Sequence, residues 1–114
     1  KHLFNLSDYH QITIELQNLG RKTLHGQFVI TTKESDNAKF TYKSNFTIYN
    51  NEANEITLPF ISFKPTKRGE PFPSAPILEL KDITSMGIRV IGRVDSNTRQ
   101  KGIFSIKITA INFD

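Results

Sequence analysis

Residues 39–49, KFTYKSNFTIY, show the clearest alternation of apolar and polar side chains in the chain. The apolar side chains share one parity, and the positions between them are polar: Phe40, Tyr42, Phe46 and Ile48. Successive side chains of a β-strand point to opposite faces, so a period of two predicts a strand with one buried face. A helix would instead repeat its apolar positions every three or four residues.

The same alternation recurs upstream of this stretch. In residues 10–19 the apolar side chains Ile12, Ile14 and Leu16 share one parity, and residues 24–32 alternate in the same way. Between these segments, residues 18–22 contain a glycine and polar side chains that are typical of a turn. The sequence therefore predicts an antiparallel hairpin over residues 10–32, followed by a polar loop at residues 33–38.

Downstream, residues 55–60, 87–94 and 102–113 are predicted as further strands. Gly92 interrupts the second of these and indicates a bulge or a close contact. In the last strand, Phe104, Ile106, Ile108 and Ala110 share one parity, and Ile103, Ile111 and Phe113 share the other. We therefore expect its ends to be covered on both faces. At residues 81–85, Asp82 is expected to cap either one helical turn or a tight bend, and Ser85-Met86-Gly87 is predicted as a turn.

All five prolines lie between Pro59 and Pro76. Proline fixes φ and lacks an N–H donor, so this segment is not predicted to form central strands. We expect a long, stiff connection that packs on the core through three phenylalanines, Phe60, Phe63 and Phe72. The same segment carries the small basic cluster of the chain, which consists of Lys64, Lys67 and Arg68.

The length and composition fit one β-rich domain. A chain of 114 residues matches the commonest domain size, and about seven short strands without helical periodicity predict an all-β fold, an antiparallel β-sandwich or barrel. The net charge of +4 favours anionic partners, but the basic residues are scattered, so nucleic acid is not the expected partner. No apolar run approaches the roughly 20 residues of a membrane span.

The residue types that carry chemistry show no catalytic or metal-binding pattern. The chain has no cysteine, and His2, His10 and His25 lack the spacing of metal ligands. No G-x-S-x-G motif or phosphate-binding glycine loop occurs, so neither an enzyme nor a cofactor site is expected. A carbohydrate-binding module remains the alternative to a protein-interaction module, although the chain has no tryptophan and Tyr9, Tyr42 and Tyr49 do not cluster.

Several stretches together resemble the CIA30 family, that of the mitochondrial complex I intermediate-associated protein 30. They are residues 55–60, then Phe63, Thr66, Arg68 and Gly69, then ITSMGI at residues 83–88 and GIFSIKITAI at residues 102–111. Upstream, NLGR at residues 18–21 resembles the glycine-arginine turn of the family. The resemblance extends from about Leu6 to Phe113 and depends on the order and spacing of these stretches.

The resemblance implies a jelly-roll sandwich similar to galactose-binding domains. It also implies a non-catalytic assembly factor or accessory subunit of a membrane respiratory or photosynthetic complex, such as respiratory complex I. Such a protein would be located in a mitochondrion or plastid, peripheral to the membrane complex and without a cofactor. Within this frame we expect Lys64, Lys67 and Arg68 to contact an acidic surface of a protein partner, although Arg68 could simply shape the turn with Gly69.

The chain also departs from the family pattern. Thr23 and Leu24 stand where the family has an aromatic residue, and Asn54 or Glu55 where it often has a tryptophan. The family's N-terminal portion has no counterpart. We therefore expect residues 1–114 to form one CIA30-like domain without the N-terminal strands, with an exposed sheet edge that another protein covers.

Overall fold

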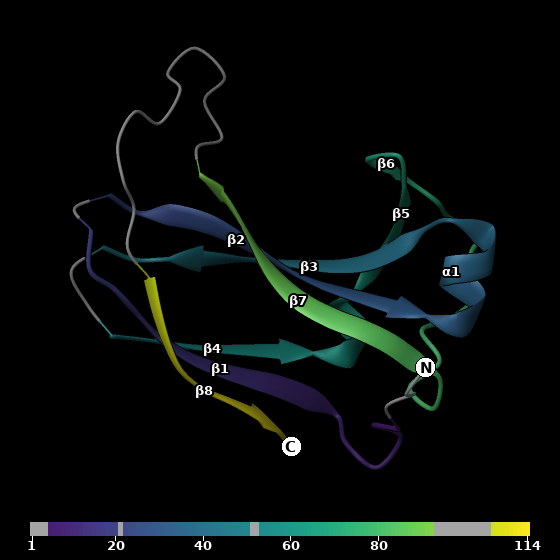
Figure 1. The fold of residues 1–114 in the computed structure, drawn as a ribbon, viewed down its shortest axis with the longest axis horizontal. Helices are drawn as coiled ribbons and strands as arrows, with labels where there is room; N and C mark the ends of the chain where they lie inside the picture. Colours follow the sequence, from purple (N-terminus) through teal and green to yellow (C-terminus); the bar gives the residue numbers. More distant parts are fainter. Residues whose placement is uncertain (1–4, 21, 51–52, 93–105) are drawn as a thin grey trace.

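The computed structural model describes residues 5–20, 22–50, 53–92 and 106–114. Eight strands, one short α-helix and one 3-10 helix succeed each other along the described chain (Figure 1). Their bounds are β1 (Gln11–Asn18), β2 (Leu24–Thr32), α1 (Lys33–Ala38), β3 (Thr41–Ile48), β4 (Ala53–Pro59), η1 (Phe60–Ser62), β5 (Lys64–Lys67), β6 (Glu70–Pro71), β7 (Ile83–Gly92) and β8 (Ile106–Phe113).

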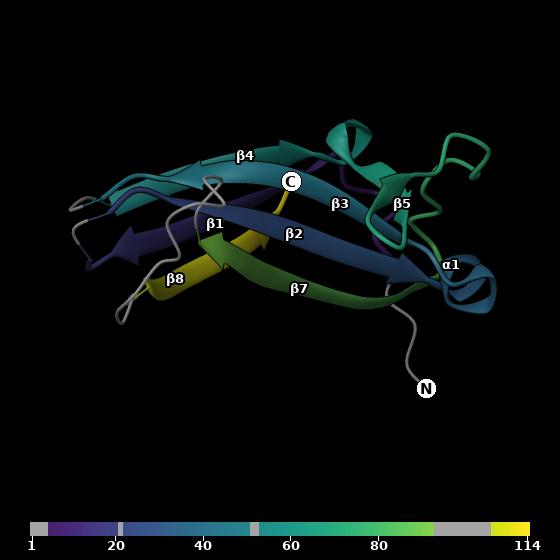
Figure 2. The ribbon, with the colours of Figure 1, turned by 90° about the horizontal axis from the view of Figure 1, so that it is seen from above.

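The strands form two antiparallel sheets that face each other. One sheet has the order β4-β1-β8 and the other β6-β5-β3-β2-β7. Figure 1 shows the five-stranded sheet above the three-stranded one, and the view from above in Figure 2 places β7 and β8 on the same side of the sandwich. The predicted all-β antiparallel sandwich is confirmed.

The inward-facing side chains of both sheets form one core. Ile12 and Ile14 of β1, Ile30 of β2 and Ile48 of β3 are completely buried. Between them lie aromatic side chains, including the edge-to-face pair Phe28 and Phe63. The buried parity of β1, β2 and β3 is the one that the sequence predicts.

The predicted hairpin of β1 and β2 is wrong. β1 pairs with β4 and β8, whereas β2 pairs with β3 and β7, so the chain passes from one sheet to the other after Asn18. The buried Asn18 side chain stabilises this crossing: its Nδ2 donates to the carbonyl of Lys22 over 2.9 Å, and its Oδ1 accepts from the N–H of Gly20. Alternation shows which face of a strand is buried, but it does not identify the neighbouring strand.

The predicted polar loop at residues 33–38 is wrong as well, because these residues form α1. Thr32 caps the helix: its hydroxyl accepts from the N–H of Ser35, and its own N–H donates to the Ser35 hydroxyl. The helix ends at Ala38 and is followed by the C-cap residue Lys39, which has a positive φ of 61°. A Ser/Thr three residues before a polar side chain was the available signal for this capping box.

Of the two alternatives at residues 81–85, the helical turn is wrong and the bend is present, at Asp82 immediately before β7. The turn predicted at Ser85-Met86-Gly87 is wrong. β7 begins at Ile83, which is completely buried, and continues to Gly92 along β2. Apolar side chains then follow at alternate positions, with Met86, Ile88 and Val90 packed against the core. The irregularity predicted near Gly92 is present, because the register shifts where His25 pairs with Gly92 and Gly26 pairs with Val90.

The proline-rich segment was predicted to be a connection only. In the structure it also contributes η1, β5 and β6. β5 and β6 are short and lie at one end of the five-stranded sheet, where proline disturbs few ladder hydrogen bonds. The expected anchoring is confirmed: Phe60 and Phe63 are buried, and Phe72 packs against Phe40 with ring centroids 5.2 Å apart.

The predicted division of apolar side chains between the two faces of the last strand is wrong. Glu15 pairs with Ala110 and Leu16 pairs with Ile108, so Thr109 is an extra residue in the ladder. This bulge changes the parity in mid-strand. As a result, four apolar side chains of β8 all lie opposite buried residues of β1: Ile106, Ile108, Ile111 and Phe113. Ile103 and Phe104 lie outside the described residues.

Candidate functional site

The basic cluster predicted from the sequence lies on the hairpin formed by β5 and β6. Lys67 pairs with Glu70, so the loop between the two strands consists of Arg68 and Gly69 alone. Both loop residues have positive φ, 55° and 80°. Two-residue loops with positive φ at both positions match the twist of a hairpin, and glycine adopts this conformation at little cost. Arg68 and Gly69 therefore shape the turn, and the Arg68 side chain is exposed at its tip.

Lys67 faces the interior side of this hairpin. Its Nζ lies 5.2 Å from the centroid of the Phe72 ring, which in turn packs on the buried Phe40. A lysine in this position over an aromatic ring gains about 0.5–1 kcal/mol from the ring quadrupole. Lys67 also lies opposite the carboxylate-bearing Glu70. Its charge is thus partly engaged within the hairpin.

Lys64 faces the other way. It pairs directly with Lys43 of β3, whose neighbours Tyr42 and Ser44 are buried, so both lysines point outward from the five-stranded sheet. The two residues at the ends of β5 therefore present their charges on different faces. The structure does not join Lys64, Lys67 and Arg68 into one patch, but it adds Lys43 to Lys64.

The outer surface of the five-stranded sheet continues this basic character. Arg89 of β7 is exposed and pairs with Gln27 of β2, which pairs with Asn45 of β3. Because adjacent strands are about 4.8 Å apart and Lys43 is two residues along β3 from Asn45, the backbones of Arg89 and Lys43 lie roughly 12 Å apart across β2. We call the surface formed by Lys43, Lys64, Arg89, Gln27 and Asn45 the basic face.

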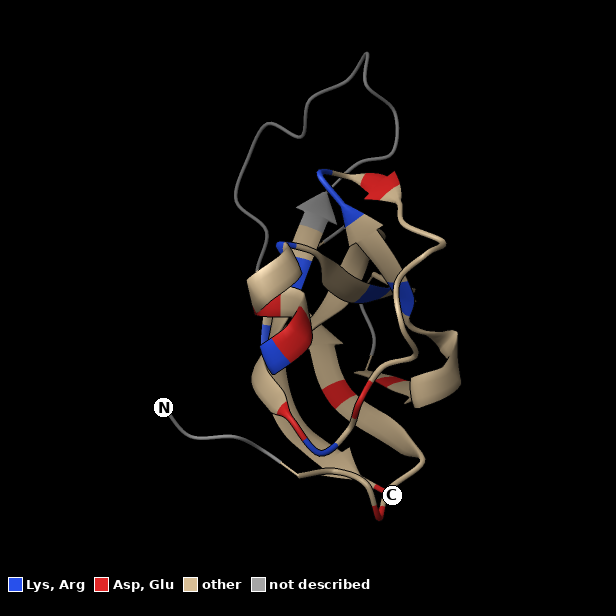
Figure 3. Cartoon of the chain, turned by 90° about the vertical axis from the view of Figure 1, so that its right-hand side faces the viewer, with Lys and Arg blue, Asp and Glu red and all other residues tan. Residues whose placement is uncertain are grey.

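Two lysines directly opposite each other on a sheet repel and destabilise the pairing of their strands. The fold does not require a lysine at both positions, because an outward-facing position of a strand accepts a side chain of either charge. Figure 3, which views the hairpin end of the molecule, shows basic residues at the turn with an acidic residue beside them, in agreement with the pairing of Lys67 and Glu70. A negatively charged partner at the basic face would relieve the repulsion between Lys43 and Lys64.

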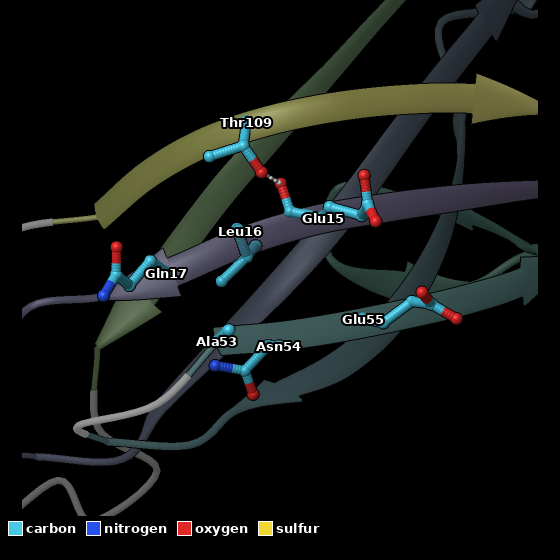
Figure 4. Close-up of a pocket in the computed structure, with 7 residues that line it drawn as sticks. All are labelled: Glu15, Leu16, Gln17, Ala53, Asn54, Glu55 and Thr109. Carbon is cyan, nitrogen blue, oxygen red and sulfur yellow. Dashed lines mark hydrogen bonds between the residues drawn. The ribbon is translucent and has the colours of Figure 1, made fainter.

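The outer face of the three-stranded sheet carries a pair of acidic residues. There Glu15 of β1 pairs directly with Glu55 of β4, and both are exposed. They line a shallow pocket of about 310 Å³ together with Leu16, Gln17, Ala53, Asn54 and Thr109 (Figure 4). The Thr109 hydroxyl donates to the carbonyl of Glu15 over 3.0 Å.

This pocket offers little for catalysis or metal binding. Its lining contains two carboxylates but no histidine or third acidic group. Over the whole described chain, no three acidic or histidine side chains gather in a way that could hold a metal ion. His10 and His25 occupy separate positions at the start of β1 and in β2, and His2 is outside the described residues.

The tyrosines do not form a sugar-stacking platform together. Tyr42 is buried, and its hydroxyl donates to the carbonyl of Pro76 over 2.7 Å. Tyr9 is exposed beside Phe113, with ring centroids 6.1 Å apart, whereas the exposed Tyr49 follows β3. These last two lie near opposite ends of β4, roughly 20 Å apart by the rise of a strand.

Among the described helices, none has the length and apolar character of a membrane span.

The basic residues Lys64, Lys67 and Arg68 were predicted as a cluster because they lie close together along the chain. Lys43 was missed because it sits in the polar parity of β3, and only the pairing of β3 with β5 brings it opposite Lys64. Arg89 was missed as well, and it is exposed because it lies on the outward parity of β7, between Ile88 and Val90, which pack against the core.

Comparison with known proteins places this geometry in a family. The model of the family described as complex I intermediate-associated protein 30 (CIA30) matches residues 1–108. An uncharacterized protein of Schizosaccharomyces pombe (strain 972 / ATCC 24843), C9E9.15, is 32% identical over 77 residues, which are 67% of this chain but only 34% of that relative. No solved structure matches the chain. Since the family model covers nearly the whole sequence, the chain belongs to the CIA30 family, a family associated with complex I assembly and not a known enzyme family.

Proposed function

We propose that this chain is a non-catalytic protein-interaction module that binds acidic surfaces of subunits of a membrane respiratory or photosynthetic complex, respiratory complex I in the first place. Membership of the CIA30 family is the observation that carries this proposal. The basic face provides the means of contact, since its strands are fixed by two ladders on either side of β3.

The paired lysines support an anionic partner. Lys64 is exposed and Lys43 is half-buried, and the pairing of their strands fixes the two backbone positions opposite each other. Repulsion of this kind costs roughly 0.2–1 kcal/mol in an isolated domain. A carboxylate placed between the two lysines removes that cost and adds attraction, so the complex gains more than two separate surface contacts would give.

Arg68 extends the contact at the tip of the hairpin. Its side chain is exposed and stands on a two-residue turn, whereas Lys67 is partly held by the Phe72 ring and Glu70. Of the three residues expected to bind a partner, Lys64 and Arg68 therefore contribute most and Lys67 least. Such a module acts as an assembly factor or accessory subunit inside an organelle, at the periphery of the membrane complex.

A double charge reversal tests this function. Lys43→Glu combined with Lys64→Glu should greatly reduce co-purification of complex I subunits with the tagged protein from mitochondria. The fold should persist, because both side chains lie on the outer face. The matched control is Lys22→Glu with Lys81→Glu, which changes the net charge equally at two exposed positions away from the basic face.

Equal loss of binding in both double variants would mean that net charge and not this surface attracts the partner. Full binding by the Lys43 and Lys64 variant would refute the assignment of the basic face. A carbohydrate-binding module is not proposed, because the exposed tyrosines Tyr9 and Tyr49 lie at separate ends of the sandwich.

A further inference from the structure

The strands at the two sides of the sandwich differ in how well their edges are protected. On the side of β4, β5 and β6, the strands carry prolines or are only a few residues long, with Pro59, Pro65 and Pro71 among them. Proline, charge and short length are the features by which sheets prevent further strands from adding to their edges. That side is therefore better protected against strand addition than the side of β7 and β8.

The side formed by β7 and β8 has no such protection. β7 and β8 contain ten and eight residues, and neither includes a proline. Figure 2 shows both strands at the same side of the sandwich. In the described part of the chain, the three-stranded sheet ends at β8, so one edge of this strand has no neighbour. Its single charged residue is Lys107.

β8 also leaves core-facing apolar side chains uncovered. Ile108 and Ile111 lie opposite Leu16 and Ile14, which are at most 2% exposed, yet they are 47% and 42% exposed themselves. Phe113 is better covered, because the Tyr9 ring packs beside it. A further strand next to β8 would cover both isoleucines and pair the free backbone groups of the edge.

The order of side chains along β8 is symmetric about its bulge. If two β8 strands align antiparallel around a twofold axis between Thr109 and Ala110, Ile108 of each copy faces Ile111 of the other. Ile106 then faces Phe113, and Lys107 faces Asn112. In a regular strand, Ile108 and Ile111 would point to opposite faces because they are three residues apart, and they could not meet on one face of the paired strands. The extra residue Thr109 restores it, because the apolar side chains before and after the bulge lie on one face.

No like charges meet in this alignment. Lys107 and Asn112 are exposed on the outer face, and each lysine finds an asparagine of the second copy opposite it. The apolar face of the new pair is continuous with the inner face of β1 in both copies. From the unprotected edge, the exposed isoleucines and this self-complementary order, we propose that the chain forms a twofold homodimer in which the β8 strands pair antiparallel.

The dimer would join two three-stranded sheets into one continuous sheet and would leave the basic face of each copy free. Sedimentation equilibrium of the full 114-residue chain from about 1 µM to about 500 µM should show a monomer–dimer equilibrium. A chain that remains monomeric throughout this range overturns the proposal, whether or not another polypeptide binds the edge.

Substitutions at Asn112 test the alignment without touching the core. Asn112→Lys puts a lysine opposite Lys107 twice in each dimer, and Asn112→Glu puts a carboxylate there. The two cross-strand pairs in the dimer should raise its Kd roughly 2- to 30-fold in Asn112→Lys, through repulsion. They should lower it by a similar factor in Asn112→Glu, through attraction. Asn45→Lys and Asn45→Glu, at an exposed position of β3, are the matched controls. A dimer with the same Kd in both Asn112 variants as in the unchanged chain uses another surface and refutes the inference.

Disulfide formation tests the register directly, because the chain contains no cysteine. Residues opposite each other in antiparallel strands have Cα atoms roughly 4.5–5.5 Å apart, within reach of a disulfide. When mixed under mild oxidation, Lys107→Cys and Asn112→Cys chains should form a mixed dimer much faster than either forms a dimer alone. Equal rates of all three reactions would exclude this register.

Discussion

Gly26 lies under the ring of a buried phenylalanine, and adding a methyl group there should destabilise the sandwich. A Cβ atom at Gly26 would stand 2.5 Å from Cε2 and 2.7 Å from Cζ of Phe46. Carbon atoms in ordinary contact are about 3.5–4.0 Å apart, so the ring or the backbone of β2 must move by roughly 1 Å. Phe46 is only 8% exposed, and the surrounding core restricts that movement.

Overpacking of a core by one carbon atom costs about 1–3 kcal/mol. Replacing glycine also restricts the unfolded chain, which returns roughly 0.4–1 kcal/mol in favour of folding. We therefore expect Gly26→Ala to lower the free energy of unfolding by up to about 2.6 kcal/mol. At roughly 4–8 °C per kcal/mol for a domain of about this size, the melting temperature should fall by several degrees.

Gly87→Ala is the matched control, because no atom lies within 4 Å of a Cβ at Gly87 and its φ is not positive. Urea unfolding of both variants measures the difference. Phe46→Leu provides a second comparison: with a smaller side chain above Gly26, the cost of Gly26→Ala should shrink, as a double-mutant cycle would show. Equal stabilities of Gly26→Ala and Gly87→Ala would refute the packing argument.

Three further substitutions test contacts that hold the fold together. Burial, and then the charge of Glu34, raise the pKa of Tyr42. Because the phenol of the unfolded chain ionises first, the stability is intact below about pH 10 and should fall as the pH rises further. Tyr42→Phe should remove this part of the fall, which urea unfolding midpoints at each pH would measure. Thr32→Ala should cost about 1 kcal/mol through loss of the N-cap of α1, and Thr32→Ser should restore most of it in thermal unfolding. Asn18→Ala leaves the buried crossing between the sheets without its donor and should cost about 1–3 kcal/mol, whereas an unchanged melting temperature would contradict the role of Asn18.

The face that each of the first three strands buries could be predicted from the sequence, because alternation is a local property. Residues such as Ile12, Ile14 and Ile30 follow a period of two, and the backbone of a strand converts that period directly into two faces. The anchoring role of Phe60 and Phe63 was also predictable. Prolines make the segment stiff, and the phenylalanines are its large apolar side chains, so these are the residues that pack into the core.

Strand partners could not be predicted in the same way. β1 and β2 have nearly equal patterns, and a turn between them suggested a hairpin, but the buried Asn18 directs the chain into the other sheet. The bulge at Thr109 was equally hidden, because it exists only in the pairing of β8 with β1. Its effect is large, since it moves Ile111 and Phe113 to the face of Ile108.

The candidate site shows the same division. The sequence alone predicted the all-β fold, the basic cluster of residues 64–68 and the resemblance to the CIA30 family. These follow from composition, turn residues and the order of motifs, which can be seen without knowing which strands pair. The tertiary structure alone decided that Lys64 stands opposite Lys43 while Lys67 turns to Phe72, and that Ile108 and Ile111 lie uncovered at an open edge. Both results depend on which strands pair and in which register, and long-range pairing is fixed by the packing of the whole core and not by any one segment.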